Sequence, residues 1–367
     1  MALTPDGVTR LRALGLEVVV EAGAGAAAQL PDRAYVDAGA RIVEADELRR
    51  KSGISLRIRP PRPEELDGLA PGHVVIGLLE PLARPERARL LADAKLTAVS
   101  LDCLPRTLSR AQSMDVLTSQ ANVAGYAAVL LAGHTYDGFF PMLMTAAGTT
   151  RPASVLVIGA GVAGLQAIAT ARRLGAVVTG SDVREAARAD VLSTGATFLQ
   201  LGGATVTGSD GYARALTDDE RREQQLSLSA AVARFDVVIT TAQVPGRRPP
   251  LLMDAAAVDA LRPGSVVIDL AASELGGNLA GSTPDATVVT RNGVHIVGAG
   301  SLPSSMPRTA STAWSRNVTS LLGALLRDGA PVIDLTDEVQ AGVVITYDGD
   351  VVHPGVLSLL PDPEARS

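Results

Sequence analysis

The stretch Ser154-Val-Leu-Val-Ile-Gly159-Ala-Gly161-Val-Ala-Gly164 joins an apolar strand pattern to a glycine-rich turn, and a helical pattern follows it. Gly159 allows the tight turn out of the strand, Gly161 lets the backbone approach a pyrophosphate, and Gly164 lets the helix pack closely on the sheet. The helix N-terminus then directs unpaired N–H groups and its positive dipole end at the phosphates. The stretch therefore predicts a dinucleotide-binding unit, with a glycine turn of purely structural purpose as the alternative.

A second strand pattern, Val177-Val-Thr-Gly-Ser181, ends in Asp182, 23 residues after Gly159. A carboxylate at this place accepts hydrogen bonds from a ribose 2′-hydroxyl and repels a 2′-phosphate, which favours NAD over NADP. Arg184 leaves the alternative open, because a nearby arginine accommodates a 2′-phosphate. Arg184 can equally be a solvated residue at the start of the next helix.

Length and composition restrict the class of protein. The 367 residues suffice for two domains, and with 47% hydrophobic but only 3% aromatic residues their cores consist mainly of Ala, Val and Leu. The net charge of −6 and the lack of a basic run argue against a nucleic-acid partner. The single cysteine, Cys103, excludes an internal disulfide and a cysteine-based zinc cluster, and it fits a small buried side chain in a reducing compartment. No metal site is predicted.

No membrane insertion is predicted either. We find no signal-peptide pattern and no run of 18 apolar residues. The apolar stretch 123–132 is too short to span a bilayer and is typical of a buried helix.

Strand and helix patterns alternate along the first third of the chain, which predicts a parallel sheet covered on both faces. The first helix begins after Thr4, which can cap it, with Pro5 at its first position. The expected strands are 16–20, 40–43, 55–58, 73–77 and 97–101, and the expected helices are 32–39 and 84–94.

The rest of the chain predicts a second domain and a return to the first. Its expected strands are 154–158, 177–181, 197–200, 235–240, 265–269 and 294–297. A helical apolar stripe over 310–327 leads back, and Asp348-Gly349 predicts a hairpin. We therefore expect an α/β protein of two Rossmann-like, doubly wound parallel-sheet domains with an inter-domain cleft. One domain comprises 1–120 plus 310–367 and the other 121–309, with a connecting helix at about 113–133.

The stretch 201–224 fits neither strand nor helix. It contains glycines, the aromatic Tyr212 and the charged run 218–223. Such a long loop in a compact domain is often a lid, so we expect a mobile loop on the cofactor side, with a plain surface insertion as the alternative.

A second polar constellation occupies 106–119, with Arg106, Gln112 and Asp115 just before an apolar helix. Alone it could be a helix start with capping residues. Together with Met144-Thr-Ala-Ala-Gly148, the glycine turn and the stretch 268–278, it resembles the NAD(H)-binding domain I, or alpha subunit, of proton-translocating NAD(P) transhydrogenase. The resemblance extends from about Leu3 to Pro354, and alanine dehydrogenase is the related alternative.

The resemblance implies roles for individual residues. Gln112 and Asp115 would hold the nicotinamide ring as catalytic residues, with Thr118 in place of a family serine. The family arginine falls on Thr107, so that Arg106, our third catalytic candidate, stands one residue further away. The cofactor-binding set implied by the turn and the resemblance is Gly159, Gly161, Val162, Ala163, Gly164, Asp182, Val183, Arg184, Thr118, Tyr212, Ala242 and Gln243.

The predicted chemistry is hydride transfer between two nicotinamides, which requires positioning but no acid or base at the reacting atoms. An alanine dehydrogenase needs a lysine and a histidine in its first domain. Here Arg59 stands at the lysine position, and the stretch 78–82 lacks a histidine. Glu274 stands where that enzyme has an acid. An amino-acid dehydrogenase and a nucleotide-sensing protein remain the alternatives.

The resemblance also implies partners. We expect this chain to bind NAD(H), and a separate subunit to bind NADP(H) and to join it to membrane-embedded domains. We expect a homodimer on the cytoplasmic side of the cell membrane, peripheral to it. Relatives carry one more strand before Ala2-Leu-Thr-Pro5, so the chain is expected to start late.

Overall fold

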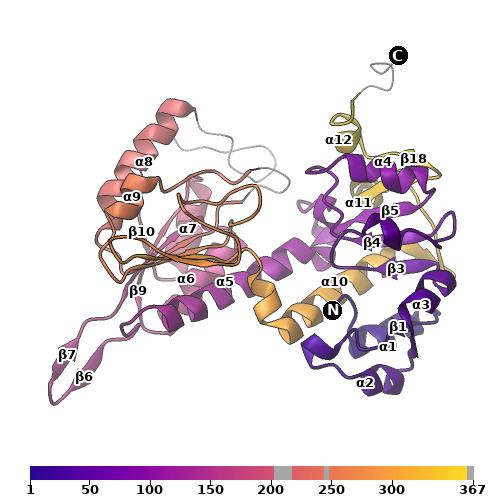
Figure 1. The fold of residues 1–367 in the computed structure, drawn as a ribbon, viewed down its shortest axis with the longest axis horizontal. Coiled ribbons are helices and arrows are strands. Elements are labelled where there is room, and N and C mark those ends of the chain that lie inside the picture. The colour runs from indigo at the N-terminus through magenta and orange to yellow at the C-terminus, as the bar shows by residue number, and fades with distance from the viewer. Residues whose placement is uncertain (202–216, 244–247, 362–367) are drawn as a thin grey trace. The chain divides into compact units, whose positions relative to one another are not determined.

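The computed structural model describes residues 1–201, 217–243 and 248–361. The chain forms two compact units, one of Met1–Gln120 with Pro307–Ser367 and one of Ala121–Met306. In Figure 1 the first unit combines the indigo and yellow ends of the colour range, because both ends of the chain build it.

The second unit contains a seven-stranded sheet in the order β10-β9-β8-β11-β12-β14-β13. All neighbours pair in parallel except β13 with β14. The strands are β8 (Ser154–Ile158), β9 (Val177–Ser181), β10 (Thr197–Phe198), β11 (Val237–Thr240), β12 (Val266–Asp269), β13 (Thr287–Val289) and β14 (His295–Gly298). The order reverses between β8 and β11, which confirms the doubly wound arrangement for this unit.

Helices cover both faces of this sheet. Alternate residues of β8 belong to different cores: Val155 and Val157 pack with α6 (Val162–Arg173) and α7 (Ala186–Ser193). Leu156 and Ile158 pack with α8 (Asp218–Val232) and α9 (Ala255–Asp259). Because both faces are buried, the central strands are continuous apolar runs.

The loop expected at 201–224 is wrong at its C-terminal end, because helix α8 already begins at Asp218. Residues 202–216, with Tyr212, lie outside the described residues, but the charged run after them is helical. The Thr217 hydroxyl accepts a hydrogen bond from the Glu220 N–H at 3.3 Å, and the Glu220 carboxylate accepts one from the Thr217 N–H at 2.8 Å. This capping box starts the helix at Asp218.

The first unit contains a mixed sheet in the order β18-β17-β5-β4-β3. Only β3 (Ile54–Leu56), β4 (Val74–Gly77) and β5 (Thr97–Ser100) are parallel, so the expectation of one parallel sheet here is wrong in two respects. First, β17 (Val344–Tyr347) and β18 (Asp350–Val351) add antiparallel strands. Second, among the described strands, β1 (Val19–Glu21) and β2 (Arg41–Val43) form a separate two-stranded sheet.

The β17–β18 hairpin is confirmed. Asp348 and Gly349 both have positive φ angles, 51° and 86°, as the favoured two-residue hairpin turn requires. The remaining short strands form two hairpins, β6 (Leu143–Thr145) with β7 (Gly148–Thr150) and β15 (Leu326–Arg327) with β16 (Ala330–Pro331).

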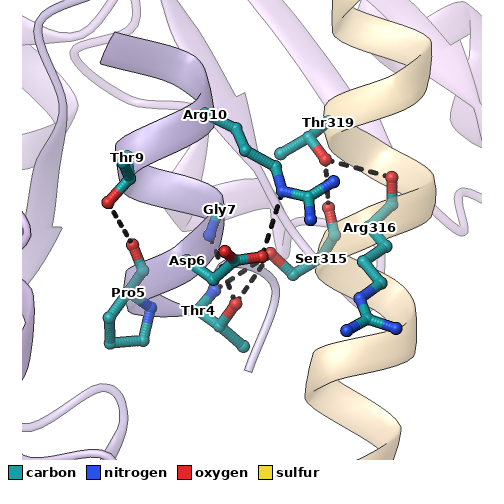
Figure 2. A network of polar contacts seen from close by, with 9 residues as sticks. All are labelled: Thr4, Pro5, Asp6, Gly7, Thr9, Arg10, Ser315, Arg316 and Thr319. Carbon is teal, nitrogen blue, oxygen red and sulfur yellow. Dashed lines mark hydrogen bonds and ion pairs between the residues drawn. The ribbon is translucent and has the colours of Figure 1, made fainter. Parts of the chain in front are cut away.

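Helix α1 (Pro5–Ala13) packs closely on α10 (Pro307–Leu325) (Figure 2). Thr4 caps α1, as expected, and both its N–H and its hydroxyl donate to the Ser315 hydroxyl at 3.1 Å. A Cβ atom on Gly7 would lie 2.3 Å from that hydroxyl oxygen, so the crossing depends on glycine. The other helices of the unit are α2 (Asp32–Asp37), α3 (Ala45–Lys51), α4 (Glu86–Asp93), α11 (Glu338–Val343) and α12 (Pro354–Leu357), with short 3₁₀ helices between them.

Helix α5 (Val116–Thr135) begins in the first unit and continues into the second, and its bounds lie close to those of the connecting helix expected at about 113–133. Its length and mean hydropathy of 1.2 would suffice to cross a membrane. However, Ala128, Val129 and Ala132 are fully buried in the core of the second unit. These three residues of the helix therefore form part of that core.

Candidate functional site

The glycine turn has the geometry that its sequence predicts. Gly159 has a φ angle of +96°, which favours glycine, directly after β8. A Cβ atom on Gly164 would lie 1.8 Å from the Gly159 carbonyl oxygen, so α6 approaches the turn too closely for any side chain. A Cβ atom on Gly161 would meet nothing within 4 Å. The turn is therefore tight behind Gly159 and open at Gly161, where a phosphate group would approach.

Helix α6 begins at this turn with Gly161 as its cap and no side-chain hydrogen bond there. Val162 and Ala163 form its first turn and are half-buried. Gly125 of α5 lies against this turn, since a Cβ atom on it would be 2.1 Å from the Ala163 carbonyl oxygen. The N-terminus of α6 thus presents backbone N–H groups from a firmly packed helix.

Asp182 follows β9, next to the glycine turn. Its Oδ2 accepts a hydrogen bond from the Ala160 N–H at 2.7 Å. Its Oδ1 accepts from the Arg184 N–H at 2.8 Å, and the Arg184 guanidinium pairs with both carboxylate oxygens at 3.0 Å. Burial opposes the charge of Asp182, but the bonds from Arg184 and Ala160 outweigh it and keep the pKa of Asp182 below its ordinary value. Arg184 is therefore an ion-pair partner in this structure, and Val183 between them is half-buried.

The strands β8 and β11 end side by side at the point where the strand order reverses, which is where ligands bind in such sheets. The Thr241 hydroxyl donates to the Gly159 carbonyl at 2.9 Å and so ties the two strand ends together. Ala242 and Gln243 follow, and the Gln243 amide donates to the Leu270 carbonyl at 2.8 Å. These two cofactor candidates thus lie at the same sheet edge as the glycine turn.

Two residues that position this edge were missing from the predicted set. Asn278, fully buried, donates to the Ala242 carbonyl at 2.8 Å and accepts from the Ala242 N–H at 3.0 Å. Asp269, also fully buried, accepts from the Asn278 N–H at 2.9 Å and from the Thr240 hydroxyl at 3.1 Å. Asp269 stands at the end of an apolar strand pattern, which is the signal that could have identified it.

In the first unit, Arg106, Asp115 and Thr118 form a compact polar cluster. Asp115 Oδ2 accepts from Arg106 Nε at 2.8 Å and from the Thr118 hydroxyl at 2.6 Å, and its Oδ1 accepts from the Thr118 N–H at 2.8 Å. Arg106 also donates to the Thr118 hydroxyl at 2.7 Å. Burial raises the pKa of Asp115, but the bonds from Thr118 and Arg106 outweigh this and lower it overall. Arg106 therefore reaches the cluster although Thr107 occupies the expected position.

Gln112 is close to this cluster in sequence, but its environment differs from that of the buried Asp115. It is exposed, on the 3₁₀ helix η4 (Ser109–Met114). The Asn317 amide of α10 donates to the Ser113 carbonyl of η4 at 2.8 Å, so a buried side chain holds the short helix in place. Sequence reasoning missed Asn317 because 204 residues separate it from Ser113.

The residues considered for an amino-acid dehydrogenase lie in the following environments. His73 is buried with its Nε2 at 2.6 Å from the Ser55 hydroxyl, and His353 caps α12 through a bond from the Val356 N–H. Arg59 and Glu274 are exposed.

Comparison with known proteins identifies the family of this chain. The model of the family described as "Alanine dehydrogenase/PNT, N-terminal domain" matches residues 1–124, and that described as "Alanine dehydrogenase/PNT, C-terminal domain" matches residues 128–354. The "NAD(P) transhydrogenase subunit alpha" of Cereibacter sphaeroides is 41% identical over 96% of this chain and 68% of that protein. An alanine dehydrogenase of Bacillus subtilis is 29% identical over 97% of this chain and 90% of that protein.

The solved structure of a transhydrogenase from Sinorhizobium meliloti superposes with a TM-score of 0.85 at 41% identity, covering 96% of this chain and 95% of that one. A match of this extent spans both units. The chain therefore belongs to the alanine dehydrogenase/PNT family, on the branch of the NAD(P) transhydrogenase alpha subunits.

Proposed function

We propose that this chain binds NADH at the edge of the second unit's sheet and passes its hydride to NADP⁺ held by a separate subunit. Binding rests on the open Gly161, the N-terminus of α6 and the carboxylate of Asp182. Backbone N–H groups here suit a pyrophosphate, and the buried carboxylate suits a ribose diol. The other proposed cofactor contacts at this edge are Val162, Ala163, Val183, Ala242 and Gln243.

The observation that carries the proposed reaction is the state of Asp115. Its two oxygens accept three hydrogen bonds, one from an arginine, and its pKa is lowered. Such a carboxylate stays ionised at neutral pH, so it has no proton to give, and its lowered pKa makes it a weak base. We infer that Arg106, Asp115, Thr118 and the exposed Gln112 orient a nicotinamide carboxamide and take no part in proton transfer. Hydride transfer between nicotinamides requires only such positioning.

An amino-acid dehydrogenase is the second candidate and is less well supported. It requires an acid and base beside the cofactor. Arginine stays protonated at Arg59, and two of the histidines, His73 and His353, serve as buried or capping side chains.

We further propose that the chain acts as a homodimer, on the cytoplasmic side of the membrane through its partner subunits. The support for a dimer is the hairpin β6–β7, which projects from the sheet of the second unit (Figure 1). Its segment exposes three large apolar side chains: Phe139 at 57%, Met142 at 57% and Met144 at 75%. An isolated two-stranded hairpin is marginal in water, so a second copy covering it would stabilise both.

The decisive experiment mixes the purified chain with an NADP(H)-binding subunit and follows reduction of an NAD analogue by NADPH. We expect activity only when both proteins are present. In Gln112→Ala the rate should fall far more than NADH affinity, because the amide orients the ring. Turnover of pyruvate, ammonium and NADH by the chain alone would instead establish the dehydrogenase.

A further inference from the structure

The acceptor capacity of Asp182 is already used in this structure. A carboxylate offers about four acceptor positions. Those of Asp182 receive bonds from the Ala160 N–H, the Arg184 N–H, Arg184 Nε and Arg184 Nη2, at 2.7 to 3.0 Å. The Asp182 side chain is 6% exposed and that of Arg184 29% exposed. A ribose diol must donate hydrogen bonds to the Asp182 carboxylate. The acceptor positions of that carboxylate are therefore already filled when the ribose arrives.

The four hydrogen bonds differ in whether a ligand can displace their donors. Those from the Ala160 and Arg184 N–H groups are fixed by the backbone of the turn and of the strand end. The two guanidinium bonds belong to a side chain with rotatable bonds, so they are the ones that a ligand can replace. The ribose hydroxyls would then take one position on each carboxylate oxygen.

We propose that the Arg184 guanidinium occupies the ribose position on Asp182 while no nucleotide is bound, and that the adenosine ribose displaces it. The inference rests on the proposed NAD(H) site. Arg184 then acts as a competing internal ligand, which lowers the affinity for NAD(H) and favours its release. Arg184 also reduces the selectivity for NAD(H) over NADP(H). Without Arg184 the unpaired carboxylate of Asp182 would repel a 2′-phosphate more strongly.

This role predicts two effects of opposite sign in Arg184→Ala. Loss of the ion pair lowers the melting temperature of the nucleotide-free protein, since it leaves a buried carboxylate with fewer donors. Loss of the competitor strengthens NADH binding, by about tenfold or more, because the two guanidinium hydrogen bonds to Asp182 no longer have to be broken. A merely structural arginine would lower both stability and affinity.

The test is calorimetric titration of the full chain with NADH, with thermal denaturation of the same samples without nucleotide. Arg173→Ala is the matched control, since it removes an exposed arginine from the last turn of α6 in the same unit. We expect tighter NADH binding and lower apo stability only in Arg184→Ala. Unchanged or weaker NADH binding in Arg184→Ala would overturn the inference.

A second titration isolates the ribose. ADP should bind Arg184→Ala more tightly than the wild-type chain, whereas 2′,3′-dideoxy-ADP should bind both equally, because it has no hydroxyl to compete for the carboxylate. An equal gain for both nucleotides would contradict displacement by the ribose.

Asp182→Ala separates this inference from the proposed function. If NADH affinity is unaffected by Asp182→Ala, the proposed ribose site is wrong and the inference fails with it. If Asp182→Ala weakens NADH binding while Arg184→Ala does not strengthen it, the site stands and only the competition by Arg184 is refuted.

Discussion

Among single residues, the three glycines of the glycine turn are required for different reasons. Gly159 is required by its backbone angle and Gly164 by the carbonyl against it, whereas Gly161 has free space around it. The first two are needed for folding, and the third is explained only by something that approaches from outside. This difference separates a binding turn from a structural one.

Gly161→Ala and Gly164→Ala should therefore have contrasting effects. We expect Gly161→Ala to change the free energy of unfolding by no more than about 0.5 kcal/mol, yet to weaken NADH binding, because its methyl group enters the pyrophosphate position. Gly164→Ala should cost about 1–3 kcal/mol of stability by overpacking. Chemical denaturation and calorimetry of the pair measure both effects, and a stability loss in Gly161→Ala would contradict the assignment.

His73 predicts a pH dependence of stability. Burial lowers the pKa of His73 below its ordinary value of about 6.5, so the folded chain favours the neutral ring. The corresponding stability is present above about pH 6.5 and is lost as the pH falls through the lowered pKa, because the unfolded chain then binds the proton more readily.

Melting temperatures should therefore decline less between about pH 7.5 and pH 5 in His73→Gln than in the wild-type chain. Ser55→Ala is the control: it should retain the acid-side decline, since burial and not the Ser55 hydroxyl is the main cause. Identical pH profiles for His73→Gln and the wild-type chain would show that this histidine does not titrate with folding.

Among the helices and strands, α10 organises the first unit. Its Ser315 hydroxyl accepts a hydrogen bond from the Thr4 N–H at the start of α1 (Figure 2). Its Asn317 amide donates to the Ser113 carbonyl of η4. One helix near the C-terminal end thus anchors the first helix of the chain and the short helix with Gln112. The helix itself could be predicted from its apolar stripe, but neither contact could.

Asn317→Ala should therefore act on both stability and hydride transfer. It leaves the Ser113 carbonyl without this donor, at a cost of about 1–3 kcal/mol, and it loosens η4. We expect slower transhydrogenation with a smaller change in NADH affinity. Thr319→Val is the matched control, because the Thr319 hydroxyl donates to carbonyls of its own helix. Equal rate losses in the two variants would refute a positioning role for Asn317.

The helix α8 illustrates an element whose signal was present but overlooked. The sequence Thr217-Asp-Asp-Glu220 is a capping box, and it could have been recognised without a structure. By contrast, the detached pair of β1 and β2 has no local signal, since its strands look like those that join the main sheet.

For the molecule as a whole, the proposed homodimer predicts that the hairpin β6–β7 forms the interface between the two copies. Met144→Glu should shift the sedimentation coefficient toward a monomer, because it puts a charge on an apolar surface that a second copy would bury. Leu226→Glu is the matched control, a similarly exposed apolar residue at 69% on α8, away from the hairpin. A dimer unaffected by Met144→Glu, or equally affected by Leu226→Glu, would exclude the hairpin as the interface.

Local sequence was sufficient to predict the glycine turn, the acid after the second strand, the apolar strands of the doubly wound sheet and the β17–β18 hairpin. These features depend on backbone angles and on periodicity within a few residues, which neighbouring side chains already specify. The folded chain was needed to show that the Arg184 guanidinium pairs with Asp182 and that Arg106 reaches Asp115 despite its shifted position. It was also needed to show that Asn278 holds Ala242 and that Asn317 holds η4. Which donor meets which acceptor depends on how buried groups from distant segments satisfy one another, and no local pattern contains that information.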